Sequence, residues 1–190
     1  MKARNPSEKV IHLAKRRAGN SSGSGDTTRR KRKAATRVLA ITSGKGGVGK
    51  TNIVANLGYA FSGLGQKVLI LDADMGLGNL DVLLGIAPKY NLSHVFSGEL
   101  EIEEIIEEGP GGLKILPASS GIQELTQLST DQKRLILSEL DCLVENVDML
   151  LIDTAAGISS NVMDFNVSAH EIIVVVSPEP TSITDAYALM

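Results

Sequence analysis

The 190-residue sequence is poor in the side chains that build disulfides and histidine-rich metal centres. It contains one cysteine and three histidines, and the histidines lie far apart along the chain. A single cysteine excludes an internal disulfide, and scattered histidines form no metal-binding cluster. Because Cys142 lies beside Leu143 in a helical stretch, we interpret it as a packing residue.

Long apolar segments are also missing. No apolar run approaches the roughly 18 residues of a membrane-spanning helix, and the N-terminus lacks the apolar core of a signal peptide. Hydrophobic residues nevertheless make up 43% of the chain, which is enough for one well-packed core. We therefore expect a cytoplasmic protein with one folded domain.

Charge is distributed unevenly, although the net charge is only −3. Residues 1–37 contain 12 Lys and Arg against 2 acidic residues, whereas the remainder contains 7 against 20. The basic part includes a candidate short helix, a Gly/Ser-rich linker and a cluster of five basic residues at 29–33. We predict a basic, flexible tail at residues 1–36 and a folded domain at residues 37–190. The basic cluster could contact RNA, anionic lipid or an acidic partner, or could be a solvated tail.

A glycine-rich motif of the form G-x-x-x-x-G-K-[ST] occupies residues 44–51. An apolar run before it predicts a buried strand, and apolar residues at three- and four-residue spacings after it predict an amphipathic helix. A loop in this position aims backbone N–H groups and the positive end of the helix dipole at phosphate oxygens. Lys50 would neutralise the β- and γ-phosphates, and the Thr51 hydroxyl would ligate Mg²⁺. The predicted nucleotide-binding residues are Gly44, Lys45, Gly46, Gly47, Val48, Gly49, Lys50 and Thr51.

The same residues also contain G-x-G-x-x-G, the fingerprint of a dinucleotide-binding turn. Asp72 stands near the position expected for a ribose-binding acid. The alternative interpretation is therefore a nicotinamide oxidoreductase that binds NAD. Lys50 and Thr51 favour the triphosphate, because a pyrophosphate-binding turn requires neither of them.

Strand and helix patterns alternate after residue 37. Continuous apolar runs predict strands, and amphipathic patterns and a capping box beginning at Ser129 predict helices. The expected strands are 38–41, 68–71, 113–117, 149–152 and 172–176, and the expected helices are 53–64, 91–96, 102–108, 129–143 and 181–190. This alternation indicates an α/β fold with an open, mostly parallel sheet covered by helices on both faces. Because the last helix has no stop signal, we expect the C-terminal part of the domain to be missing.

Three aspartates follow predicted strands. Ligands of open parallel sheets bind beyond the carboxyl ends of the strands. Asp153 and Asp72 are therefore candidate metal ligands together with Thr51, and Asp74 could orient the water that attacks a phosphate. One such acid could be a turn cap, but three beside a phosphate loop favour magnesium chemistry. We also expect the N–H group of Gly157 to sense the γ-phosphate.

These motifs resemble those of the MinD/ParA-type ATPases, whose deviant phosphate loop carries an early lysine at the position of Lys45. Segments 73–81, 152–159 and 177–187 are most similar to the FlhG branch, the regulators of flagellar number. The resemblance implies a P-loop NTPase fold, the cofactors ATP and Mg²⁺, and an ATP-dependent homodimer. In that dimer Lys45 would reach the partner's phosphates, so that it joins Lys50 and Asp74 as a catalytic residue for slow ATP hydrolysis.

The resemblance also implies partners and a location. FlhG-like proteins act on the FlhF-type GTPase and on flagellar switch proteins, and a C-terminal helix binds the inner face of the plasma membrane. That helix and the adenine contacts would lie past Met190. Residues 7–18 depart from the motif with which this branch stimulates FlhF. The alternative is a partitioning or septum-positioning ATPase that binds membrane or nucleic acid, with residues 29–33 contacting DNA phosphates.

Overall fold

The computed structural model describes residues 35–75, 78–117 and 128–190. The predicted helix at residues 7–18 and the basic cluster at 29–33 lie outside these residues. In chain order the main elements are β1 Arg37–Ser43, α1 Lys50–Gly63, β2 Val68–Ala73, α2 Leu80–Leu84, α3 Leu92–Phe96, η2 Ile102–Ile105, β3 Glu107–Glu108, η3 Pro110–Gly112, β4 Lys114–Leu116, α4 Thr130–Leu143, η5 Val144–Asn146, β5 Met149–Ala156, α5 Ser160–Ser168, β6 Glu171–Val174 and α6 Pro180–Leu189.

The strands form one sheet in the order β3-β4-β2-β5-β1-β6. All neighbouring strands run parallel except β3, which is antiparallel to β4 at one edge. The predicted open, mostly parallel sheet is therefore confirmed. Asp72 of β2 and Asp153 of β5 are direct partners in the strand register, so these two predicted acids lie side by side.

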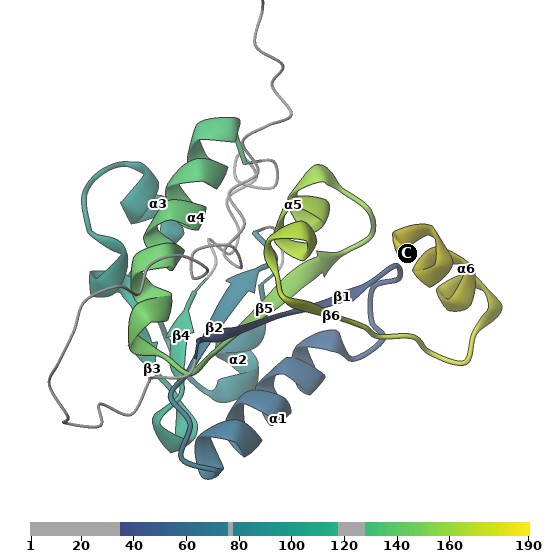
Figure 1. The fold of residues 1–190 in the computed structure, drawn as a ribbon, viewed down its shortest axis with the longest axis horizontal. Helices are drawn as coiled ribbons and strands as arrows, with labels where there is room; N and C mark the ends of the chain where they lie inside the picture. The colour runs from purple at the N-terminus through teal and green to yellow at the C-terminus, as the bar shows by residue number, and fades with distance from the viewer. Residues whose placement is uncertain (1–34, 76–77, 118–127) are drawn as a thin grey trace, which may run out of the picture.

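Helices cover both faces of the sheet. Successive side chains of a strand point to opposite faces, so neighbouring residues pack against different helical layers. Val38 and Ala40 of β1 belong to a core cluster with α3, α4 and α5, whereas Leu39 and Ile41 belong to the cluster on the α1 side. Figure 1 shows these two helical layers, with α6 beyond the end of β1 and β6. The central strands are buried on both faces, which explains why their sequences are continuous apolar runs.

The predicted helix at residues 102–108 is wrong in its second half. The 3₁₀ turn η2 ends at Ile105, and Glu107–Glu108 forms the edge strand β3. Two consecutive glutamates are unfavourable at the negative C-terminal end of a helix. Strand β6 also ends at Val174 instead of residue 176.

Two further features differ from expectation. The helices α2 and α5 were not predicted, and Cys142, expected to pack, is exposed. The predicted capping box of α4 is confirmed, because the Gln132 backbone N–H donates to the Ser129 hydroxyl at 3.2 Å and the Gln132 side chain accepts from the Ser129 N–H at 2.8 Å. Among the described residues, no helix has both the length and the apolar character needed to cross a membrane.

Candidate nucleotide-binding site

The glycine-rich motif forms the loop between β1 and α1. Gly49 has a φ of 92° and lies directly before the first residue of α1, and no side chain of the described residues caps this helix. A Cβ atom at Gly49 would meet nothing within 4 Å, so the left-handed backbone, not a lack of space, requires glycine here. The first N–H groups of α1 and the helix dipole consequently form a binding site for an anion.

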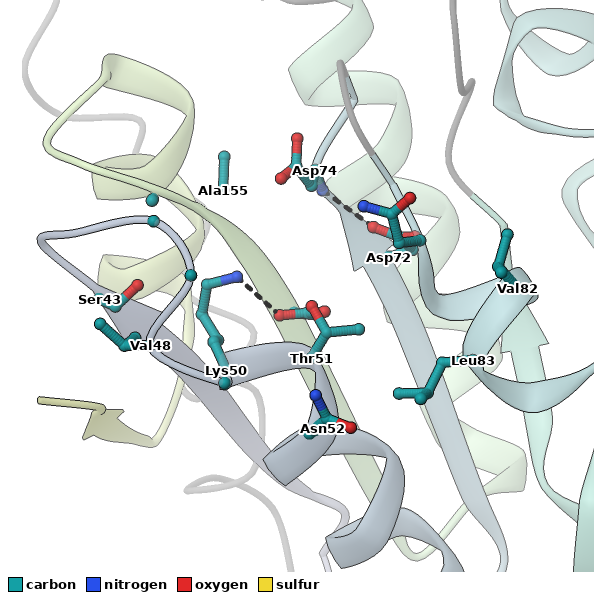
Figure 2. A pocket seen from close by; sticks show the side chains of 16 residues that line it. Ser43, Val48, Lys50, Thr51, Asn52, Asp72, Asp74, Val82, Leu83 and Ala155 are labelled. Carbon is teal, nitrogen blue, oxygen red and sulfur yellow. Dashed lines mark hydrogen bonds and ion pairs between the residues drawn. The ribbon is translucent and has the colours of Figure 1, made fainter. Parts of the chain in front are cut away.

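A cavity of about 770 Å³ opens beside this loop. Its walls come from the loop, the start of α1, the carboxyl ends of β2 and β5, and α2. The lining residues are Ser43, Gly46, Gly47, Val48, Gly49, Lys50, Thr51, Asn52, Asp72, Asp74, Asn79, Val82, Leu83, Asp153, Ala155 and Ala156. Figure 2 shows Lys50 and Thr51 on the loop side, facing Asp72 and Asp74. The cavity therefore lies where ligands of parallel α/β sheets bind.

Lys50 and Asp153 form a buried ion pair within this cavity. The Lys50 Nζ lies 3.0 Å from the Asp153 Oδ1, and the two residues are 8% and 2% exposed. Burial raises the pKa of the Asp153 carboxyl, while the Lys50 charge and a hydrogen bond from the Thr51 side chain oppose the rise. The lysine is thus already directed into the cavity, beside the hydroxyl predicted to hold the metal.

Asp72 brings a second buried carboxylate to the same edge of the sheet. Its Oδ1 accepts the Asp74 backbone N–H at 3.1 Å. Burial, followed by the negative charge of Asp153, raises the pKa of Asp72 to about 7, although the backbone N–H groups of Asp74 and Leu80 favour its charged form. One buried lysine faces two buried carboxylates, so a cation placed beside them would offset the unfavourable charge.

The side chains around this cavity fit a magnesium ion that takes some of its oxygen ligands from a bound substrate. Mg²⁺ prefers oxygen, and it usually takes one or two carboxylates together with substrate phosphates and water. Thr51, Asp72 and Asp153 all line the cavity beside the phosphate loop. Among the described residues, no group of three or more His, Cys, Asp or Glu could hold a metal ion. Two carboxylates and one hydroxyl leave coordination positions that oxygens of a triphosphate and water can fill.

Gly44 and Lys45, the first two residues of the motif, do not line the cavity. The Lys45 ammonium pairs with the Glu179 carboxylate and donates to the Thr181 hydroxyl at 3.4 Å, at the N-terminal end of α6. A Cβ atom at Gly44 would overlap the backbone of Asp185 in α6. The other six motif residues line the cavity, whereas the Lys45 ammonium pairs with a residue that does not line it.

The predicted phosphate sensor is also engaged elsewhere. The Gly157 N–H donates to the Ser43 carbonyl at 2.9 Å, so contact with a phosphate would require this bond to break. Val82 and Leu83 of α2 line the cavity, and sequence reasoning missed both. They are 76% and 45% exposed. No periodic pattern marked these two residues as part of a site, because α2, at five residues, is too short to show one.

Known proteins share this sequence and this architecture. A family profile described as an AAA domain matches residues 36–190. The antiactivator FleN of Pseudomonas aeruginosa is 49% identical over 153 residues, which are 80% of this chain and 55% of FleN. The flagellum site-determining protein YlxH of Helicobacter pylori is 40% identical over 153 residues, 80% of this chain and 52% of YlxH. The chain thus spans about half the length of these relatives.

A solved structure shows the same fold with a nucleotide. The septum site-determining protein MinD of Pyrococcus horikoshii, complexed with Mg-ADP, superimposes with a TM-score of 0.70 at 33% identity. The match covers 79% of this chain and 61% of that protein. The architecture described here is therefore one that holds a magnesium-bound adenine nucleotide in a relative.

Proposed function

The chain belongs to the AAA-domain family and, within it, to the MinD/ParA-type ATPases close to FlhG, and we propose that it is an ATP-dependent dimerisation switch that slowly hydrolyses ATP. The observation that supports this function most is the cavity in which Gly49, Lys50 and the buried Asp153 come together. Because one relative is named a flagellum site-determining protein, we extend the proposal to flagellar number and placement. FlhF-type GTPases and flagellar switch proteins are the proposed partners, and the proposed location is the cytoplasm, peripherally at the inner face of the plasma membrane.

The residues of the cavity have separate roles in this proposal. Magnesium-bound ATP, once bound, supplies a phosphorus centre with a good leaving group. The backbone N–H groups of residues 46–50 hold phosphate oxygens, and the Lys50 ammonium neutralises their charge. Thr51, Asp72 and Asp153 hold the metal. Asp74 accepts a hydrogen bond from the attacking water and orients it, which is the main requirement of phosphoryl transfer.

Lys45 is available for a role between subunits. Its ion pair with Glu179 is exposed, because the two side chains are 38% and 56% accessible to solvent. Exposed pairs contribute at most about 1 kcal/mol. Release of Lys45 from Glu179 and Thr181 is therefore cheap compared with the interaction of an ammonium group with a partner's phosphates.

Sedimentation velocity and phosphate release, each with ATP and Mg²⁺, test the proposal on three variants. We expect Lys50→Ala to lose ATP binding and dimerisation. Asp74→Ala should retain binding and accumulate as a dimer, with turnover reduced about 100-fold. Lys133→Ala is the matched control, because it removes a 2.7 Å ion pair with Asp164 outside the cavity.

Three outcomes would contradict these assignments. A wild-type chain that remains monomeric with ATP and Mg²⁺ refutes the dimerisation switch. Normal turnover by Asp74→Ala refutes the water-orienting role. ATP binding by a folded Lys50→Ala variant, with folding verified by circular dichroism, refutes the phosphate contact of Lys50.

A further inference from the structure

A second cavity, of about 490 Å³, lies at the amino ends of the strands, on the opposite edge of the sheet from the phosphate loop. We call it the rear groove. Its apolar walls are Leu69 of β2, Ile106 beside η2, Leu143 at the end of α4 and Val147 before β5. Figure 1 shows β3, β4 and α4 together in this part of the molecule. The rear groove therefore has an apolar floor that can accept the aliphatic stems of long side chains.

The rim of the rear groove is acidic. Glu103, Glu107 and Glu108 line it, against one basic residue, Lys114. Glu107 accepts the Lys89 backbone N–H at 3.4 Å. Among the ion pairs of the described residues, none involves these three glutamates or Lys114. The rim thus has carboxylates available for cations that extend over the apolar floor.

The chain enters the folded domain beside this groove. The Thr36 hydroxyl donates to the Val147 carbonyl at 2.8 Å and also bonds the Val144 carbonyl. Val147 is itself a wall of the rear groove. The bonds of Thr36 therefore fix the point from which the preceding residues depart, and that point is at the Val147 wall of the rear groove.

We propose that the five basic residues at 29–33, Arg29-Arg30-Lys31-Arg32-Lys33, dock in the rear groove of the same chain. An extended chain covers at most about 3.5 Å per residue, so Lys33 reaches about 10 Å from Thr36 and Arg29 about 25 Å. Lys33 can therefore reach the Val147 wall. Arg29 can also reach the acidic rim, because β3 lies four strands from β1, about 19 Å away. A tether this short gives an effective concentration in the millimolar range, which favours this segment over a second copy or a separate partner.

The proposed contact has a simple chemistry. Arginine and lysine stems cover the apolar floor, and their charged ends pair with Glu103, Glu107 and Glu108. The pairs lie at the rim, so salt should weaken them. Docking of the segment does not require a bound nucleotide, and it gives the charge asymmetry of the chain a structural role.

Limited proteolysis of the 190-residue chain tests this docking. Trypsin cleaves after Arg and Lys, so docked residues 29–33 should be cut slowly. In about 50 mM salt we expect the double variant Glu103→Gln/Glu108→Gln to be cut about fivefold faster than the wild type, since it loses two rim pairs. In 1 M salt, where the screening length is about 3 Å, the two rates should converge.

The control is the double variant Glu99→Gln/Asp131→Asn. It removes the same amount of charge at two residues that do not line the rear groove, and it should be cut at the wild-type rate. Equal cleavage of the wild type and Glu103→Gln/Glu108→Gln in low salt would overturn the proposal. Protection that appears only after nucleic acid or lipid vesicles are added would overturn it as well.

A nitroxide on Cys142 shows where the segment lies and in which copy. Cys142 is exposed and adjacent in sequence to Leu143 of the rear groove, so the native chain provides the labelling site. We expect the amide signals of residues 29–33 to broaden more in the wild type than in Glu103→Gln/Glu108→Gln, and reduction of the nitroxide to restore them; equal broadening of the two would reflect only the short tether and would contradict docking. Broadening that instead requires mixing spin-labelled with isotope-labelled chains would show docking between copies and contradict the proposal.

Discussion

Replacing Asp72 with Asn should make the nucleotide-free protein more stable at alkaline pH. The Asp72 carboxyl is 4% exposed, and its pKa is raised from 3.8 to about 7, first by burial and then by Asp153. The folded state therefore binds its proton more tightly than the unfolded state, and this group lowers stability as the pH rises from 3.8 to about 7. With 1.36 kcal/mol for each unit of pKa difference, the full penalty is about 4 kcal/mol.

Urea denaturation of both proteins from pH 5 to pH 8, with chelator to exclude divalent ions, measures this effect. Part of the penalty already acts at pH 5, so the stability of Asp72→Asn relative to the wild type should rise by about 3 kcal/mol between pH 5 and pH 8. The Asn side chain can still accept the Asp74 N–H, so the local hydrogen bond is retained.

The control for this measurement is Asp131→Asn, because the Asp131 side chain is 92% exposed and keeps its contact with water on folding. It removes one carboxylate at a fully hydrated position, and it should not reproduce the gain in stability expected of Asp72→Asn. If the curves of wild type and Asp72→Asn ran parallel over this range, the burial argument for Asp72 would be refuted.

Two further substitutions follow from the same geometry. Gly44→Ala should lower the free energy of unfolding by about 2 kcal/mol in chemical denaturation, because its Cβ would overlap the backbone of Asp185. Gly46→Ala is the control and should leave stability unchanged, since its Cβ would meet only the Ala156 Cβ at 4.0 Å. Equal effects of the two substitutions would contradict the close packing of α6. Lys50→Met should cost about 3 kcal/mol near neutral pH by leaving Asp153 buried without its cation, and a folded variant with wild-type stability would show that the pair is not maintained in solution.

The features that the sequence predicted well depend on local pattern. The apolar run 68–71 marks a strand buried on both faces, and β2 Val68–Ala73 is that strand. Because parallel strands place their carboxyl ends at one edge, Asp72 and Asp153 were expected near each other, and they are partners in the strand register. The glycine motif likewise predicted the loop between β1 and α1.

The features that were missed depend on contacts between distant parts of the chain. The direction of Lys45 is set by Glu179, 134 residues away, and nothing near the motif indicates this pair. The exposure of Cys142 depends on which face of α4 packs against the sheet. Two-residue β3 is too short for a periodic signal, and it forms because Glu107 and Glu108 pair with β4. Tertiary contacts decide each of these cases.

Titration calorimetry of ATP into this chain, with and without Mg²⁺, tests most directly whether the loop and its neighbouring acids bind a magnesium triphosphate. We predict a heat of binding that is strongest with Mg²⁺, that is absent for Lys50→Ala, that persists in Lys133→Ala, and that NAD does not produce. The absence of a binding heat for the wild-type chain with ATP and Mg²⁺, or an equal heat for Lys50→Ala, would contradict this account of the site.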